Sequence, residues 1–137
     1  MSITFEGSCH CAAIQFRVTI PRDQREVLDC NCTVCLKKGF LHLIVPESAF
    51  QLVKGQDRVI TYTFGTGVAK HMFCSNCGIH AFCLGGRSES GHLHLGRPRS
   101  HPDQWDVNVR CLNAPMSYWT IKAFDGANWE DNVELIS

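Results

Sequence analysis

The chain has 137 residues, of which 45% are hydrophobic and 19% are charged, a composition typical of one globular domain with an apolar core. Its 13 Lys and Arg residues balance its 13 Asp and Glu residues, which argues against a protein held to nucleic acid mainly by clustered positive charge. The first ten residues show neither a charged n-region nor an apolar h-region, and the most apolar run, residues 40–45, is too short to span a bilayer, so we expect a cytoplasmic or nuclear protein without membrane contact.

Two strands are predicted in the first third of the chain. Residues 12–20 alternate between apolar and polar side chains, and the apolar face carries Ile14, Phe16, Val18 and Ile20. This period of two is typical of a half-buried strand. Residues 40–45 are apolar except for His42, and this run stops at Pro46, which predicts a buried strand followed by a short helical turn over residues 46–50.

The middle of the chain predicts a hairpin. Residues 59–64 are rich in β-branched and aromatic side chains, a Gly-Thr-Gly turn follows at 65–67, and residues 68–73 read as the partner strand. A further strand is expected at 79–84, with shorter candidates at 92–95 and 107–112. These patterns predict a mostly β fold, a small single domain of short antiparallel strands that spans residues 1–137.

Nine cysteines need an explanation in a chain expected to be intracellular. An odd count fits a disulfide framework poorly, and clustered cysteines in a reducing compartment are more often metal ligands. Seven of the nine fall into three groups: Cys9 and Cys11, then Cys30, Cys32 and Cys35, then Cys74 and Cys77 with Gly78 directly after.

The spacing within the three groups divides the seven thiols between two ions. In a strand a C-x-C motif presents both sulfurs on one side, and a C-x-x-C motif in a tight turn brings two sulfurs around one centre. The local triplet Cys30, Cys32 and Cys35 is most simply kept on one ion. The two pairs then form a second, closed four-cysteine site. Since closed zinc sites are structural and three-ligand sites keep an open position, we expect two zinc ions, one structural and one open.

Other interpretations of the cysteines remain. A C-x-x-C motif can be a redox dithiol, although no helical pattern follows Cys77. The triplet can also recruit a fourth protein ligand, for which the candidates are His10, His42, His80 and Asp29. The two remaining cysteines, Cys83 and Cys111, stand alone in apolar surroundings and are expected to be core residues.

The residues around the cysteine groups resemble a known family. The segments that carry the resemblance lie between Gly7 and Cys111 and are Gly7-Ser8-Cys9-His10-Cys11, Asp29-Cys30-Asn31-Cys32-Thr33-Val34-Cys35, Ile44-Val45-Pro46, Lys54-Gly55, Tyr62-Thr63-Phe64 and His71-Met72-Phe73-Cys74-Ser75-Asn76-Cys77-Gly78. They look like the glutathione-dependent formaldehyde-activating enzyme family, which includes centromere protein V, and are closest to the centromere protein V branch.

This resemblance implies a β-tent fold related to zinc ribbons. It also implies that Cys9, Cys11, Cys74 and Cys77 match the family's structural zinc site, whereas Cys30, Cys32 and Cys35 match its catalytic zinc site. The enzyme members are carbon–sulfur lyases that make or break S-hydroxymethylglutathione. The expected partner of this chain is therefore a small thiol or thiol adduct, with glutathione as the candidate thiol. The competing hypotheses are a zinc-stabilised binding module that docks to a protein or chromatin, and a zinc or redox sensor.

Cleavage of a thiol–aldehyde adduct needs a base for its hydroxyl proton. His42, His71 and His80 are the candidates, and His42 is preferred because it lies on the predicted strand just after the triplet. Lys37 and Lys38 follow the triplet and either attract the carboxylates of a peptide-like thiol or form a solvated turn.

Overall fold

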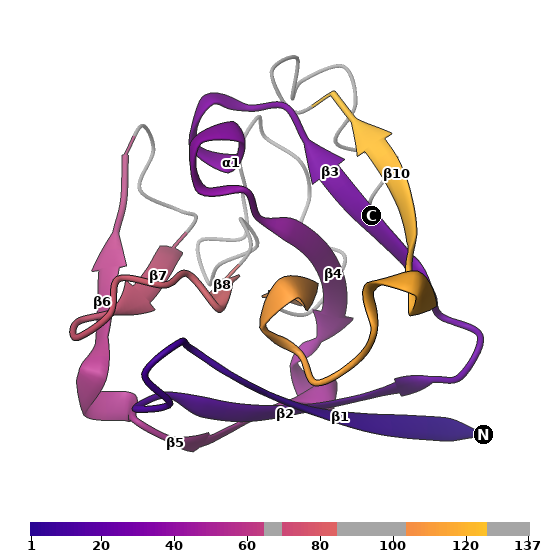
Figure 1. Ribbon diagram of the computed structural model, residues 1–137, viewed down its shortest axis with the longest axis horizontal. Helices are drawn as coiled ribbons and strands as arrows, with labels where there is room; N and C mark the ends of the chain where they lie inside the picture. Colours follow the sequence, from indigo (N-terminus) through magenta and orange to yellow (C-terminus); the bar gives the residue numbers. More distant parts are fainter. Residues whose placement is uncertain (65–69, 85–103, 126–137) are drawn as a thin grey trace.

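The computed structural model describes residues 1–64, 70–84 and 104–125, and within them the chain forms two β-sheets (Figure 1). The first sheet has the strand order β1-β2-β5 and is antiparallel throughout. Its strands are β1 (Ser2–Ser8), β2 (Gln15–Pro21) and β5 (Phe50–Lys54). These strands run along the lower edge of Figure 1 as one layer.

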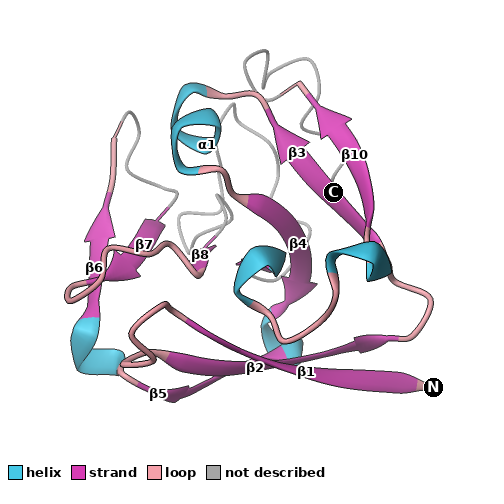
Figure 2. Cartoon of the chain, in the orientation of Figure 1, coloured by secondary structure: helices cyan, strands magenta, loops and turns pink. Residues whose placement is uncertain are grey.

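The second sheet is larger and carries most of the residues predicted to be functional. Its order is β10-β3-β4-β9-β8-β7-β6. The bounds are β3 (Glu26–Cys30), β4 (Leu41–Pro46), β6 (Val59–Tyr62), β7 (Lys70–Cys74), β8 (Phe82–Leu84), β9 (Gln104–Asn108) and β10 (Thr120–Phe124). One α-helix of the described residues, α1 (Thr33–Lys38), lies between β3 and β4 in the chain and is drawn to the left of β3 and above β4 in Figure 2.

This architecture confirms the predicted mostly β fold with antiparallel sheets. One pairing departs from the prediction, because β10 runs parallel to β3, with Phe124 opposite Cys30. A parallel pair needs a crossover connection, and here almost the whole domain separates the two strands along the chain. The pairing brings the end of β10 beside the first cysteine of the triplet.

The apolar face predicted for the second strand is buried. Ile14, Phe16, Val18 and Ile20 all belong to the main core, where they meet Leu43 and other apolar residues of the second sheet. Phe16 lies with its ring centroid 5.5 Å from that of Phe82 in an edge-on arrangement that joins the two sheets. The strand itself begins at Gln15, later than predicted, because the preceding residues form a turn.

The remaining strand predictions have mixed outcomes. The hairpin is confirmed, since β6 pairs with β7 in antiparallel register with Tyr62 opposite His71. The strand expected at 79–84 begins only at Phe82, because the backbone before it closes the C-x-x-C turn. The strand expected at 107–112 is β9 followed by a short 3₁₀ helix, Val109–Cys111. The turn at 65–67 and the strand at 92–95 lie outside the described residues.

The elements that sequence patterns did not predict are short or lie at edges. They are β1, β3, β5, β10 and α1. The helix has six residues, too few for a helical period to stand out, and it ends at Gly39, whose φ of 64° is the left-handed conformation that glycine adopts readily. The turn expected at 46–50 is a 3₁₀ helix, Glu47–Ala49. No helix in the described ranges is long and apolar enough to cross a membrane.

Candidate metal centres

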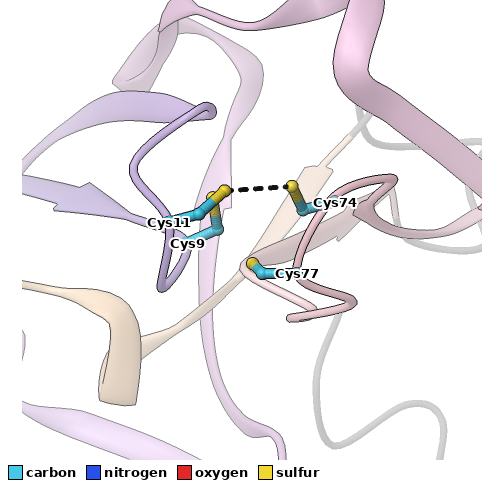
Figure 3. A group of neighbouring side chains, drawn as sticks. All are labelled: Cys9, Cys11, Cys74 and Cys77. Atoms are coloured by element: carbon cyan, nitrogen blue, oxygen red, sulfur yellow. Dashed lines mark hydrogen bonds between the residues drawn. The ribbon is translucent and has the colours of Figure 1, made fainter.

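Four cysteines from two loops meet between the sheets (Figure 3). Cys9 and Cys11 lie in the loop from β1 to β2, while Cys74 ends β7 and Cys77 follows it. The four sulfurs lie within 4.8 Å of one another, and Cys11 Sγ is 3.7 Å from both Cys9 Sγ and Cys74 Sγ. The structure therefore brings together the four cysteines predicted to share an ion, and this group can hold one.

Each loop is shaped by backbone groups that turn toward a sulfur. The Ile14 N–H donates to Cys9 Sγ at 3.4 Å, and the Asn76 N–H donates to Cys74 Sγ at 3.3 Å. Gly78 has a φ of 79°, so the glycine after the second pair permits the turn, as the sequence suggested. The expectation that the first pair sits in a strand is wrong, because β1 ends at Ser8 and the pair lies in a turn.

The surroundings of this cluster favour charge on the more exposed sulfurs. Hydrogen bonds, the largest from Asn76, lower the pKa of Cys11 to about 6. Burial raises the pKa of Cys9 to about 11. A cation placed among the four sulfurs would favour the thiolate form of all of them, since a coordinated thiol loses its proton.

The triplet lies where β3 gives way to α1. Cys30 ends β3, Cys32 is the N-cap of α1 and Cys35 is the one buried residue of that helix. The three sulfurs lie within 4.8 Å of one another, so this group can also hold an ion. The strand β10 supports it, because Phe124 packs against Cys30 and Cys35.

Asn31, between the first two triplet cysteines, anchors the loop to the end of β10. Its backbone N–H donates to the Phe124 carbonyl at 3.1 Å, and its side-chain amide donates to Asp125 Oδ1 at 3.0 Å. The sequence analysis did not identify this contact, because the two partners are 94 positions apart. These two hydrogen bonds hold Asn31, the residue between Cys30 and Cys32, against the end of β10.

The three triplet thiols share their protons unequally. Hydrogen bonds from Cys30 and Cys35 lower the pKa of Cys32 to about 2, while hydrogen bonding to its two neighbours raises the pKa of Cys35. Negative charge is therefore concentrated on the partly exposed Cys32. A set of sulfur donors around one such charge suits a soft or borderline divalent cation, and this chemistry fits zinc.

His42 connects the triplet to a carboxylate on the neighbouring strand. Its Nδ1 lies 2.8 Å from Asp106 Oδ2, and its Nε2 lies 3.1 Å from Cys35 Sγ. Since a carboxylate only accepts, Nδ1 donates its hydrogen to Asp106, and Nε2 faces the Cys35 sulfur. Asp106 was not singled out from the sequence; a carboxylate within the apolar pattern around Val107 was the available signal.

His42 and Asp106 also belong to a third group, with Cys83, whose ligand atoms lie within 4.8 Å of one another. Cys83 is buried, as expected for a core cysteine, and burial raises its pKa. Cys111, the other cysteine expected in the core, is partly buried and packs against the main apolar core. Within this third group His42 and Asp106 are joined by a hydrogen bond.

The other histidines proposed as bases take different positions. His71 is buried, and its Nδ1 accepts from Lys38 Nζ at 3.1 Å. Burial, followed by the charge of Lys38, lowers the pKa values of both His71 and His80 to about 4, so both rings are neutral near pH 7. The buried His80 Nδ1 makes no hydrogen bond within the described structure.

Four residues are candidates for a fourth ligand of the triplet. Of His10, His42, His80 and Asp29, none belongs to the group formed by the three cysteines in the part of the chain that the structure describes. His42 approaches it most clearly, through its contact with Cys35. The group as described offers three protein ligands.

The chain is similar to known proteins in sequence and in fold. The model of the glutathione-dependent formaldehyde-activating enzyme family matches residues 4–105. A crystal structure of a Rhodobacter sphaeroides protein, determined as a structural genomics target, is similar with a TM-score of 0.67 and 27% sequence identity. That similarity covers 87% of this chain and 99% of the other.

We expect Cys74→Ser to abolish cooperative folding, whereas Cys32→Ser should leave a folded domain. Cys74 is fully buried between the two sheets, and a closed thiolate site contributes on the order of 10 kcal/mol to folding in zinc-finger peptides. Cys32 is partly exposed at the start of a six-residue helix. Thermal unfolding by circular dichroism tests the difference.

Cys111→Ser is the matched control, because Cys111 lies outside both cysteine groups. It should unfold close to wild type. Equal losses of thermal stability in Cys74→Ser and Cys32→Ser would contradict the assignment of one group to the fold and the other to a more peripheral site.

We expect Asp106→Asn to lower the affinity of the triplet for its metal by about tenfold, because groups that orient ligand-contacting histidines typically change metal affinity by 10–100-fold. The substitution removes the charge that fixes the His42 ring beside Cys35. Competition with a colorimetric chelator measures the affinity, and the visible spectrum of the cobalt-loaded protein reports on the thiolate ligands.

The four-cysteine site should be unaffected in Asp106→Asn. The matched control is Asp57→Asn, whose carboxylate is exposed and pairs at 3.9 Å with Arg58. An unchanged affinity and spectrum in Asp106→Asn would show that the carboxylate does not position the triplet.

Proposed function

The chain belongs to the glutathione-dependent formaldehyde-activating enzyme family, and on this basis we propose that it is a zinc-dependent carbon–sulfur lyase. Its substrate would be a thiol–aldehyde adduct, such as S-hydroxymethylglutathione or a related thiol conjugate. The observation that carries this proposal is the triplet of Cys30, Cys32 and Cys35, which gathers three sulfurs without a fourth His, Cys, Asp or Glu ligand from the described residues. Three-ligand zinc sites are typically catalytic.

Each cysteine group has a separate role in this proposal. Cys9, Cys11, Cys74 and Cys77 would hold a structural zinc, and the triplet would hold a catalytic zinc, within one domain that spans residues 1–137. When bound at the triplet, zinc would supply a Lewis acid that stabilises the thiolate of the substrate. The four-cysteine group joins loops from two sheets, which suits a structural role.

The reaction conserves protons and electron pairs without a further reagent. In an adduct R–S–CH(OH)–R′ the carbon–sulfur bond breaks and its electron pair stays on sulfur. The hydroxyl oxygen loses its proton and forms the carbonyl of the aldehyde. The reverse direction joins a thiolate to an aldehyde and returns the proton, so one site can catalyse both directions.

His42 is the base we propose for the hydroxyl proton. Its Nε2 lies at the edge of the triplet, 3.1 Å from Cys35 Sγ. A zinc-bound Cys35 would have no hydrogen to donate, so Nε2 would then be free to accept the hydroxyl proton. Asp106 holds the opposite nitrogen at 2.8 Å, which orients the ring and would stabilise the positive charge that the ring acquires with the proton. The proton-accepting atom is therefore close to the place where the adduct would react.

The physiological partner would be a small thiol, and glutathione is the first one to test. Such a lyase would work in the cytoplasm, where the glutathione pool is kept largely reduced. The zero net charge of the chain gives no support to a chromatin partner.

We expect freshly prepared protein to contain about two zinc ions per chain, because seven cysteines form a group of four and a group of three. Elemental analysis without chelators in the purification measures this. Cys32→Ser should contain about one ion, since the four-cysteine group remains intact. One ion or none in the wild type would contradict the two-site assignment.

We expect the zinc-loaded protein to accelerate exchange between formaldehyde plus glutathione and their adduct, as followed by NMR exchange spectroscopy. Cys32→Ser should reduce the exchange to the rate without protein. His42→Ala should lower it by about a hundredfold or more, the usual contribution of a general base.

Cys111→Ser serves as the control for loss of a single thiol. Exchange no faster than in buffer, with every thiol tried, would reject the lyase and leave a zinc-stabilised binding module. Equal acceleration with glutathione and with other thiols would retain the lyase class and reject glutathione as the specific partner. Unchanged exchange in His42→Ala would remove His42 as the base.

A further inference from the structure

A hollow of about 460 Å³ lies between α1 and the hairpin of β6 and β7. Its size falls within the range of small-molecule binding sites. Helix α1 forms one wall through Thr33 and Val34, and the opposite wall is formed by aromatic side chains from the hairpin and its extension. The triplet, His42 and Asp106, which take part in the proposed reaction, do not line this hollow.

The hollow adjoins the triplet through the helix. Thr33 and Val34 are the two residues between Cys32 and Cys35. If an adduct reacts at the triplet, a substituent on that adduct would therefore extend toward this wall of the hollow.

The aromatic wall is exposed to an unusual degree. Tyr62 and Phe64 are 51% and 49% exposed, and their ring centroids are 5.7 Å apart. Phe64 also stacks on His71, at 5.2 Å and with an interplanar angle of 19°, and Phe73 completes the wall. Gathered aromatic side chains that remain half exposed in a concave surface indicate a binding site for an apolar group.

The charged side chains that line the hollow are both positive. Lys37 and Lys38 reach it from α1, and no carboxylate belongs to the described lining. Lys38 is held in place, because its Nζ donates to His71 Nδ1 at 3.1 Å and lies 4.7 Å from the centroid of the Phe40 ring. A fixed ammonium group beside an apolar wall favours an occupant that carries an anionic group as well as an apolar one.

We propose that this hollow binds the aldehyde-derived half of the adduct, and that this half carries an aromatic ring or a similarly flat apolar group. The lysines then bind a carboxylate of the thiol half. This inference rests on the proposed lyase function and narrows its substrate class. The hydroxymethyl group that formaldehyde supplies has one carbon, so it would leave Tyr62 and Phe64 in water.

Two unreactive thioethers test the inference. S-benzylglutathione places a ring on the carbon attached to sulfur, whereas S-methylglutathione has the same carboxylates and no ring. We expect the zinc-loaded protein to bind the benzyl compound about tenfold or more tightly, because the buried ring adds apolar contact that the methyl compound lacks. Isothermal titration calorimetry measures both affinities.

Variants then locate the preference. Tyr62→Ala and Phe64→Ala should each reduce the affinity for S-benzylglutathione and leave that for S-methylglutathione unchanged. Because both side chains are half exposed, neither substitution should unfold the protein. Ile121→Ala is the matched control, since Ile121 is 52% exposed on β10, outside the lining of the hollow.

The outcomes separate this inference from the lyase proposal, because neither thioether reacts. Equal affinity for the two compounds, failure of both to bind, or a benzyl preference that survives Tyr62→Ala and Phe64→Ala together would overturn the inference, even if exchange of the formaldehyde adduct is fast. A benzyl preference lost in those variants would support the aromatic subsite, even in a protein whose exchange activity is absent.

Discussion

The meeting of four cysteine sulfurs from two loops is the constraint on which the rest of the structure depends. Cys9 and Cys11 follow the first strand of one sheet, whereas Cys74 ends a strand of the other and Cys77 follows that strand. Backbone N–H groups aimed at Cys9 and Cys74 shape both loops so that their sulfurs converge. Thiolates at such distances repel one another unless a cation lies among them. A metal ion bound among them would therefore couple the relative position of the sheets to metal binding, in addition to the apolar core that they share.

Helix α1 depends on polar contacts more than on apolar burial. It has six residues, and Cys35 is its one buried side chain. Isolated helices of this length are unstable in water. Cys35 and Lys38 lie three positions apart and so share a face, and through them the helix contacts His42 on β4 and His71 on β7. Two histidines, His42 and His71, thus orient the helix that carries Cys35. The same helix forms one wall of the hollow, so its orientation affects both the triplet and that wall.

Local patterns predicted the parts of this structure that depend on local chemistry. The alternation from Ile14 to Ile20 predicted a buried face, and the spacing of the cysteines predicted which of them share a cluster. The sequence could not show that β10 pairs in parallel with β3, because that pairing joins distant segments with no turn between them. Asp106 was missed for a related reason: it contacts His42 because β4 and β9 pair in a register with Ile44 opposite Asp106. Residues 42 and 44 share a face, so the carboxylate and the ring become diagonal neighbours.

Selectivity in a lyase of this kind has to come from groups that do not react. Breaking the carbon–sulfur bond makes the same demands on sulfur and on the hydroxyl proton for every hemithioacetal, so the triplet and His42 cannot distinguish one aldehyde from another by chemistry alone. Contacts to the remainder of the adduct can, and a difference of one apolar group in a pocket typically changes rates by 10–200-fold. In this chain such contacts would come from the hollow that Tyr62, Phe64 and Lys38 help to line. Their combination of aromatic surface and fixed positive charge makes the end of β6 the part of the molecule where substrate preference would be set.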